Sequence, residues 1–182
     1  NAAATIPAAY RQIRQLGKVR GHAPEANALV GRMTRQIRSI VDTVREKAVE
    51  GSVYHELDQN LYSVTSNTFV GRVYAMFGLR NIADAAKGGS DYPQLSAEYV
   101  VASNPGLIVL ADTVCCGQTA QSVASRPGWS RIAAVRTGSI VRTPNPAGTS
   151  VEFGWFFVHD AADVDRDGVR DIYVGDFADA WR

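Results

Sequence analysis

The stretch from Tyr92 to Asp112 constrains the fold of this chain more than any other, because it combines a loop, a helix, a stop and a buried strand. Ser96 stands where an N-cap would, with an acid close behind it, which predicts a short helix that ends at Asn104-Pro105-Gly106. The run Leu107 to Ala111 is continuously apolar, as is typical of a parallel strand buried on both faces. This is the helix-to-strand half of a βαβ unit, and open α/β sheets place ligands at the carboxyl end of such a strand.

The length and charge of the chain limit the remaining possibilities. Its 182 residues suffice for one domain with a proper core, and a formal net charge of +1 gives no reason to expect nucleic acid as a partner. No apolar run approaches the length of a membrane span, and an initiator Met and an apolar leader are missing. We therefore expect the chain to start inside a longer protein or after a processing site.

Two amphipathic helices are predicted before residue 50. The first covers Ile6 to Gly17, with Gly17 and Gly21 ending it, and the second covers Pro24 to about Glu50. The second helix has a single apolar stripe that we expect to pack along one edge of a sheet, and its arginines most simply form a solvated face. The stripe includes Leu29, Met33, Ile37 and Val44.

After residue 50, strand signals alternate with helix signals. This order predicts an α/β fold, with a mainly parallel sheet flanked by helices in three layers and Leu107 to Ala111 as a central strand. The other predicted elements are strands at Val53 to Leu57 and Ser139 to Arg142, a short extended piece at Leu61 to Val64, and helices at Phe69 to Phe77 and Thr119 to Ser125.

The order of several segments carries a family resemblance. VYHELD, LYSVTSNTFVGRVYAMFG, NIAD, YPQLSAEYVVASNPGLIVLAD and CCGQTAQSVASRPGWSRIAAVRTGSIV together resemble the second lobe of class III ABC-transporter substrate-binding proteins. This family includes the periplasmic vitamin B12, iron-siderophore and haem binding proteins. The resemblance implies two α/β lobes joined by a rigid helix, with a ligand in the cleft between them. It divides the chain into a lobe-connecting segment (1–50), a substrate-binding lobe (51–142) and an atypical tail (143–182), and the first lobe is absent.

The resemblance also implies which residues bind the ligand. Tyr92 stands just before Pro93, where relatives often carry an aromatic ring that stacks on a metal-chelate or corrinoid ligand. The turn formed by Asn67, Thr68 and Phe69 would face the cleft, where free backbone N–H groups can receive anionic ligand groups. Tyr62 either lines the same wall or is a half-buried strand aromatic.

Glu98 occupies the family's P-Q-x-S-x-E position, where the second lobe offers an acid to arginines on the membrane permease. A carboxylate in the first turn of a helix is favoured by the helix dipole and is accessible to a bidentate arginine. Without the resemblance, an ordinary capping acid would explain the same residue.

The adjacent Cys115 and Cys116 suggest redox or metal chemistry. Neighbouring Cα atoms lie about 3.8 Å apart, below the usual disulfide range, so a bridge between them would be unusual. The three histidines show no zinc-ligand spacing with the pair, so we expect a loop pair near the cleft whose oxidation state stays open. Since G-x-S-x-G, H-E-x-x-H and phosphate-loop motifs are absent, neither an enzyme nor an organic cofactor is predicted.

The tail departs from the family, because relatives end in a long helix. Asp163, Asp165, Asp167 and Asp171, with Gly168, follow the D-x-D-x-D-G-x-x-D spacing of a calcium loop, and Ile172 to Val174 would follow as a strand. The alternative is an acidic, solvated turn.

Two functions remain open on this evidence. The first is the solute-binding component of an ABC importer for iron-siderophore, cobalamin or haem-type ligands. It would be periplasmic or extracellular, with a lipid anchor on the full-length protein as one option, and would reach the membrane through the permease. The second is an extracellular, calcium-stabilised interaction module that uses a transporter-like lobe as a scaffold.

Overall fold

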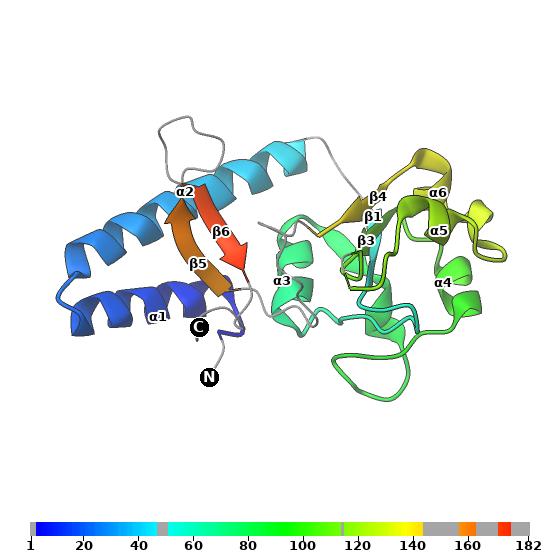
Figure 1. The fold of residues 1–182 in the computed structure, drawn as a ribbon, viewed down its shortest axis with the longest axis horizontal. Coiled ribbons are helices and arrows are strands. Elements are labelled where there is room, and N and C mark those ends of the chain that lie inside the picture. The colour runs from blue at the N-terminus through cyan, green and yellow to red at the C-terminus, as the bar shows by residue number, and fades with distance from the viewer. Residues whose placement is uncertain (1–2, 47–50, 114, 144–156, 163–170, 176–182) are drawn as a thin grey trace.

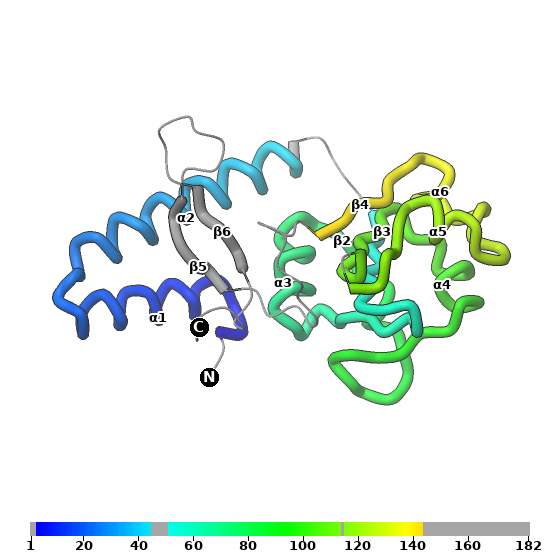
Figure 2. The backbone as a smooth tube through the Cα atoms, in the orientation of Figure 1, coloured from blue at the N-terminus to red at the C-terminus, as the bar shows by residue number. Residues whose placement is uncertain are grey.

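The computed structural model describes residues 3–46, 51–113, 115–143, 157–162 and 171–175. Two long helices, α1 (Ile6–Val19) and α2 (Ala23–Glu46), form an antiparallel hairpin to one side of an α/β body (Figure 1). The tube in Figure 2 passes from this hairpin into the body, where strands and short helices alternate along the chain. Within the described ranges, no helix is both long enough and apolar enough to cross a membrane.

A four-stranded parallel sheet forms the centre of the α/β body, as predicted. The strands lie in the order β2-β1-β3-β4, so β3 is an inner strand and the prediction of a central strand at this segment is confirmed. Val53 pairs with Leu107, and Ile108 pairs with Ile140. The strands are β1 (Gly51–Glu56), β2 (Leu79–Asn81), β3 (Leu107–Leu110) and β4 (Ile140–Arg142).

Short helices connect the strands and cover the sheet. One core cluster lies on one face of the sheet, where Tyr54, Ile108 and Leu110 pack with residues of these helices such as Val100 and Val123. The helices are α3 (Phe69–Met76), η1 (Ile82–Ala85), α4 (Ala97–Ser103), α5 (Ala120–Ala124), η2 (Trp129–Arg131) and α6 (Ala133–Thr137).

Helix α4 begins and ends where the sequence predicts. The Ser96 side chain caps it by accepting from the Tyr99 N–H, and Asn104 ends it in the left-handed region at φ 47°. The Asn104 side chain also accepts from the N–H of Ala133 at 2.8 Å, so this stop ties α4 to α6.

The prediction that Gly17 ends the first helix is wrong. Helix α1 continues to Val19, and Gly17 is buried against α2, where a Cβ on Gly17 would lie 2.3 Å from the Cβ of Ala26. Glycine is used here for the close approach of two helices, and α1 instead ends at Arg20 before Gly21, whose φ is +77°.

The partner predicted for the long helix is also wrong. Its apolar stripe is buried at Val30 and Met33, but α2 packs chiefly against α1 and not along an edge of the sheet. The apolar stripe indicates which face of α2 is buried but not which element covers it. Because α1 is joined to α2 by a short turn, α1 is the nearest surface that can do so. Towards its carboxyl end, Val44 joins Val109 and Val141 in lining an apolar groove.

Two smaller elements differ from the prediction. The Leu61 to Val64 segment is extended but is not a strand of the sheet; it makes one isolated antiparallel bridge, between Tyr62 and Gln94. Strand β2 is not predicted, because three residues, Leu-Arg-Asn, carry no alternation that could identify it. In the tail, β5 (Phe157–Ala162) pairs antiparallel with β6 (Asp171–Gly175), and β6 contains the strand predicted at Ile172 to Val174.

Candidate ligand-binding rim

The carboxyl ends of β1 and β3 meet at one edge of the sheet because the two strands are parallel neighbours. Glu56 pairs with Leu110 in the sheet, and the N–H of Ala111 donates to the Glu56 carbonyl at 2.9 Å. Glu56 and Asp112 are therefore carried by adjacent strand ends, at the position where α/β sheets bind ligands.

Two loop segments join at this rim and carry the two tyrosines that are predicted to contact the ligand. Ser63 N–H donates to the Pro93 carbonyl at 2.9 Å, and Leu95 N–H donates to the Leu61 carbonyl at 3.0 Å. The Tyr62 and Tyr92 side chains are 39% and 46% exposed. The tertiary structure thus brings Tyr62 and Tyr92, thirty positions apart in the sequence, onto two adjoining segments with their rings accessible to a ligand.

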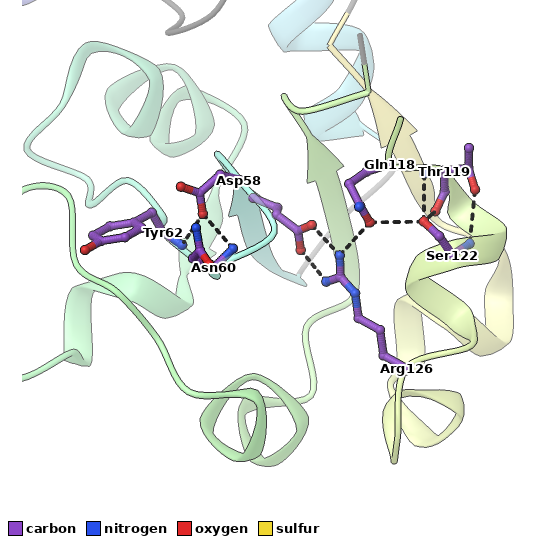
Figure 3. A network of polar contacts seen from close by, with 8 residues as sticks. Asp58, Asn60, Tyr62, Gln118, Thr119, Ser122 and Arg126 are labelled. Atoms are coloured by element: carbon purple, nitrogen blue, oxygen red, sulfur yellow. Dashed lines mark hydrogen bonds and ion pairs between the residues drawn. The ribbon is translucent and has the colours of Figure 1, made fainter. Parts of the chain in front are cut away.

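A turn at Asp58 starts the first of these segments. Its carboxylate accepts from the backbone N–H groups of Asn60 at 2.8 Å and Tyr62 at 3.4 Å (Figure 3). Leu61, between them, has a φ of 66°, a conformation that a side chain other than glycine seldom adopts. The turn therefore determines the direction in which the Tyr62 segment leaves the sheet.

The predicted turn of Asn67, Thr68 and Phe69 does form the start of α3, but its polar groups are engaged locally. Thr68 is buried; its hydroxyl donates to the Thr65 carbonyl and accepts from the Gly71 N–H at 3.0 Å. The N–H groups of Asn67 and Thr68 donate to Thr65, at 3.4 and 3.1 Å. Phe69 is half-buried, so the exposed Asn67 side chain is the polar group that this turn presents outward.

A buried ion pair lies behind the rim, and the sequence analysis does not identify it. The Arg126 guanidinium donates to both carboxylate oxygens of Glu56, each at 2.6 Å, and one of its nitrogens also donates to Gln118 at 2.8 Å. Figure 3 shows Arg126 and Gln118 in this network. The guanidinium also stacks over the ring of Trp129, 4.6 Å from its centroid.

Asp112 adds a second buried acid to this cluster. It is fully buried, and neither of its carboxylate oxygens has a hydrogen-bond partner among the residues described. Burial, and then the charge of Glu56, raises the pKa of Asp112 to about 7. Two carboxylates cannot hydrogen-bond to each other until one is protonated, so a single arginine balances the pair when Asp112 holds a proton.

One sequence signal could have indicated this cluster. Glu56 falls inside the strand predicted at Val53 to Leu57, and a carboxylate that such a strand buries requires a counter-charge somewhere in the fold. The partner could not be named, because Arg126 follows it by 70 positions. The neighbouring His55 is structural: its Nδ1 lies 2.6 Å from the Tyr74 hydroxyl, and burial lowers the pKa of His55 to about 4.

Glu98 is exposed in the first turn of α4. Hydrogen bonding to its own backbone N–H, and then to Ser96, lowers the pKa of Glu98, so the side chain is ionised at neutral pH. Glu98 is therefore both hydrogen-bonded near the start of the helix and exposed, so its geometry is compatible with permease docking and with an ordinary capping acid.

Cys115 and Cys116 form a disulfide in an exposed turn directly after β3. The pair lies in a loop after the strand, as predicted, and the oxidation state that the sequence left open is the bridged one in this structure. Its position near a cleft stays a prediction.

The acidic loop of the tail lies mostly outside the described residues. Asp163, Asp165 and Asp167 are not described, and Asp171 begins β6. In the part of the chain that is described, no group of three His, Cys, Asp or Glu side chains could hold a metal ion. Calcium binding therefore stays a prediction.

Two hollows in the described structure lie away from this rim. One, of about 540 Å³, is lined by Gly51, Arg80 and Asn104 near the amino ends of the strands; the other, of about 560 Å³, is the groove beside Val109 and Val141. The rim itself carries the two exposed tyrosine rings.

Comparison with known proteins gives consistent results. Residues 3–147 match the family described as periplasmic binding protein. An uncharacterised ABC transporter substrate-binding lipoprotein from Bacillus subtilis is 29% identical over 140 residues, covering 75% of this chain and 42% of the relative. A cobalamin-binding protein from Halobacterium salinarum is 30% identical over 109 residues, covering 59% of this chain and 29% of that protein.

Solved structures show the same fold. A possible iron-binding, periplasmic solute-binding protein from Staphylococcus epidermidis has a TM-score of 0.66 at 20% identity, covering 77% of this chain and 54% of that one. The chain thus spans less than half of the curated relatives and about half of this structure.

Proposed function

Because the chain belongs to the periplasmic binding protein family, we propose that it is the second lobe of the solute-binding component of an ABC importer. The observation that carries this proposal is the pair of exposed rings, Tyr62 and Tyr92, on adjoining segments at the carboxyl edge of a parallel sheet. Aromatic rings of this kind offer flat apolar area at low conformational cost. Such a wall suits a flat conjugated ligand.

The ligand class follows from the wall and from the relatives. Cobalamin and haem present broad conjugated faces on which tyrosine rings can stack, and ferric siderophores complete the range. The cobalamin-binding relative and the iron-binding structure support this range. The other lobe would supply further contacts, so the identity of the solute depends on that lobe as well.

Docking to a permease is the second part of the proposal. Glu98 is ionised and exposed at the start of α4, so an arginine of the permease can reach its carboxylate. A solute-binding protein of this type works outside the cytoplasmic membrane, in the periplasm or on the cell surface. The lipoprotein relative makes a lipid anchor on the full-length protein part of this proposal.

Solute titration of a two-lobed protein, in which this chain is joined to a first lobe, tests the proposal. The two-lobed protein is titrated with cyanocobalamin, haemin and a ferric siderophore, and bound solute is followed by its visible absorbance. We expect saturable binding of one of the three. Glu98→Gln should leave that affinity unchanged and reduce uptake in cells, whereas Glu25→Gln on α2 should change neither. Failure of all three solutes to bind the folded two-lobed protein would overturn the assignment.

A calcium-stabilised interaction module remains the second candidate. It rests on the D-x-D-x-D-G-x-x-D spacing and on its position between two paired strands, β5 and β6. A loop that brings four carboxylates to one cation would stabilise the hairpin on which it is carried. This candidate predicts calcium binding by the chain without any solute.

A further inference from the structure

The two cysteines of this chain occupy a turn at the carboxyl end of β3. Both side chains are exposed, and they are the only cysteines in the sequence. The bridge between them therefore joins two consecutive residues, both of which are exposed. An exposed dithiol pair is chemically competent for exchange, unlike a buried structural disulfide.

The turn is organised around one backbone carbonyl. The N–H groups of Cys116 and Gln118 donate to the Asp112 carbonyl at 3.2 and 3.4 Å. Gly117 between them has a φ of +65°, which allows the chain to fold back so that both groups reach the same acceptor. The position of Gln118 thus depends on the conformation of the two cysteines before it.

The same turn can accommodate the two cysteines as free thiols. Consecutive residues hold their Cα atoms 3.8 Å apart, below the range of ordinary disulfides, and bridges outside that range are more easily reduced. The Cys115 sulfur lies 3.8 Å from the Asp112 carbonyl oxygen. As a thiol it can donate a weak hydrogen bond to this oxygen, so reduction exchanges the bridge for a local contact.

Gln118 connects the turn to the buried ion pair. Its side-chain oxygen accepts from Arg126 at 2.8 Å and from Ser122 at 3.1 Å. Arg126 in turn holds Glu56 and covers the Trp129 ring. A shift of Gln118 would remove one acceptor from Arg126 and change the polarity next to Trp129.

We propose that Cys115 and Cys116 form a reversible thiol–disulfide exchange site, and that its oxidation state sets the position of Gln118 against Arg126. The reductant is a dithiol. One of its thiolates attacks a sulfur of the pair and forms a mixed disulfide; its second thiolate then closes the oxidised ring of the reagent. Two electrons and two protons pass to the pair, which becomes the dithiol.

The experiment compares oxidised and dithiothreitol-reduced forms of the 182-residue chain. Alkylation followed by mass spectrometry should add no label to the oxidised form and two labels to the reduced form. In a Trp155→Phe/Trp181→Phe background, which retains Trp129 alone, reduction should shift the tryptophan emission. Amide exchange at Gln118 should become roughly fivefold faster, the factor expected for the loss of one hydrogen bond. Oxidised glutathione should reverse these changes.

Two variants separate the exchange chemistry from its transmission. In Cys115→Ser/Cys116→Ser, the Trp129 emission should no longer respond to dithiothreitol. In Gln118→Ala, the two labels should still appear on reduction while the emission response is lost. Two labels on protein kept under air would overturn the exchange site, and an unchanged Trp129 emission on complete reduction would overturn the link through Gln118.

Discussion

Arg126 binds Glu56 through two hydrogen bonds of 2.6 Å, although the two residues are 70 positions apart. Glu56 is fully buried at the end of β1, whereas the Arg126 side chain is 19% exposed. The pair therefore joins the end of a central strand to the turn after α5, directly behind the rim that carries the two exposed tyrosines. Its energetic and chemical consequences can be measured.

Arg126→Ala should destabilise the protein by about 3–5 kcal/mol, because it leaves the Glu56 carboxylate buried without a counter-charge. Urea unfolding followed by circular dichroism measures this loss. The double variant Glu56→Gln/Arg126→Gln should recover part of it, since the buried charge is then gone. Arg136→Ala, at an exposed arginine of α6, should stay within about 0.5 kcal/mol of the wild type. A similar small loss for Arg126→Ala would contradict the role of the pair.

Asp112 should make stability depend on pH. Its pKa is raised from 3.8 to about 7 in the folded protein, so between these values the folded state holds a proton that the unfolded state has released. Stability should therefore fall as the pH rises from about 4 to about 7, and then level off. Asp112→Asn should flatten this slope. Compared with the wild type at the same pH, the variant should be more favourable at pH 8 than at pH 5.

Unfolding curves across that pH range check the slope. Asp42→Asn, at an exposed position of α2, provides the control and should keep the slope of the wild type. If Asp112→Asn also kept that slope, Asp112 would not be the group that holds the proton.

Gly17→Ala should destabilise the α1–α2 hairpin, because the new Cβ would lie 2.3 Å from that of Ala26 and the two helices would have to separate. The matched change is Gly31→Ala in α2, where the nearest atom to the new Cβ is the tip of the Arg35 side chain at 3.5 Å. Removing that glycine should stabilise the helix by about 0.5–1 kcal/mol. Thermal unfolding of both variants should give shifts of opposite sign, and equal shifts would argue against close packing at Gly17.

Tyr92→Ala should weaken solute binding by the two-lobed protein by about 1–3 kcal/mol, through lost stacking, with little change in melting temperature. Tyr62→Ala should act in the same direction because its ring lies on the adjoining segment. Tyr10→Ala, on α1, is the control for loss of a tyrosine elsewhere. Unchanged affinity with a lowered melting temperature would show that Tyr92 supports the fold and not the ligand.

Calcium should stabilise the chain if the acidic tail forms a cation loop. Extracellular sites of this kind bind with dissociation constants of about 10⁻⁴ to 10⁻³ M, so the melting temperature should rise at millimolar calcium relative to chelator. Asp165→Ala should abolish the rise and the heat measured by titration calorimetry. Identical melts of the wild type in calcium and chelator would leave the segment as an acidic, solvated turn.

Part of this structure could be predicted from local sequence because its causes are local. Ser96 and Asn104 delimit α4 through contacts within a few residues. The continuous apolar run that begins at Leu107 favours a strand covered on both faces, as β3 is. Each of these outcomes follows from side-chain chemistry and backbone preference at the position itself.

Only the tertiary structure decided the features whose partners are distant in the chain. Strand β2 is a strand because β1 offers it a hydrogen-bonding edge, and Gly17 is a contact and not a stop because α2 folds back over it. Tyr62 and Tyr92 become one wall through backbone pairing between two loops. Glu56 required some counter-charge, but many arginines could supply it. The free energy of a buried ion pair depends on distance and desolvation, which exist only once the chain has folded.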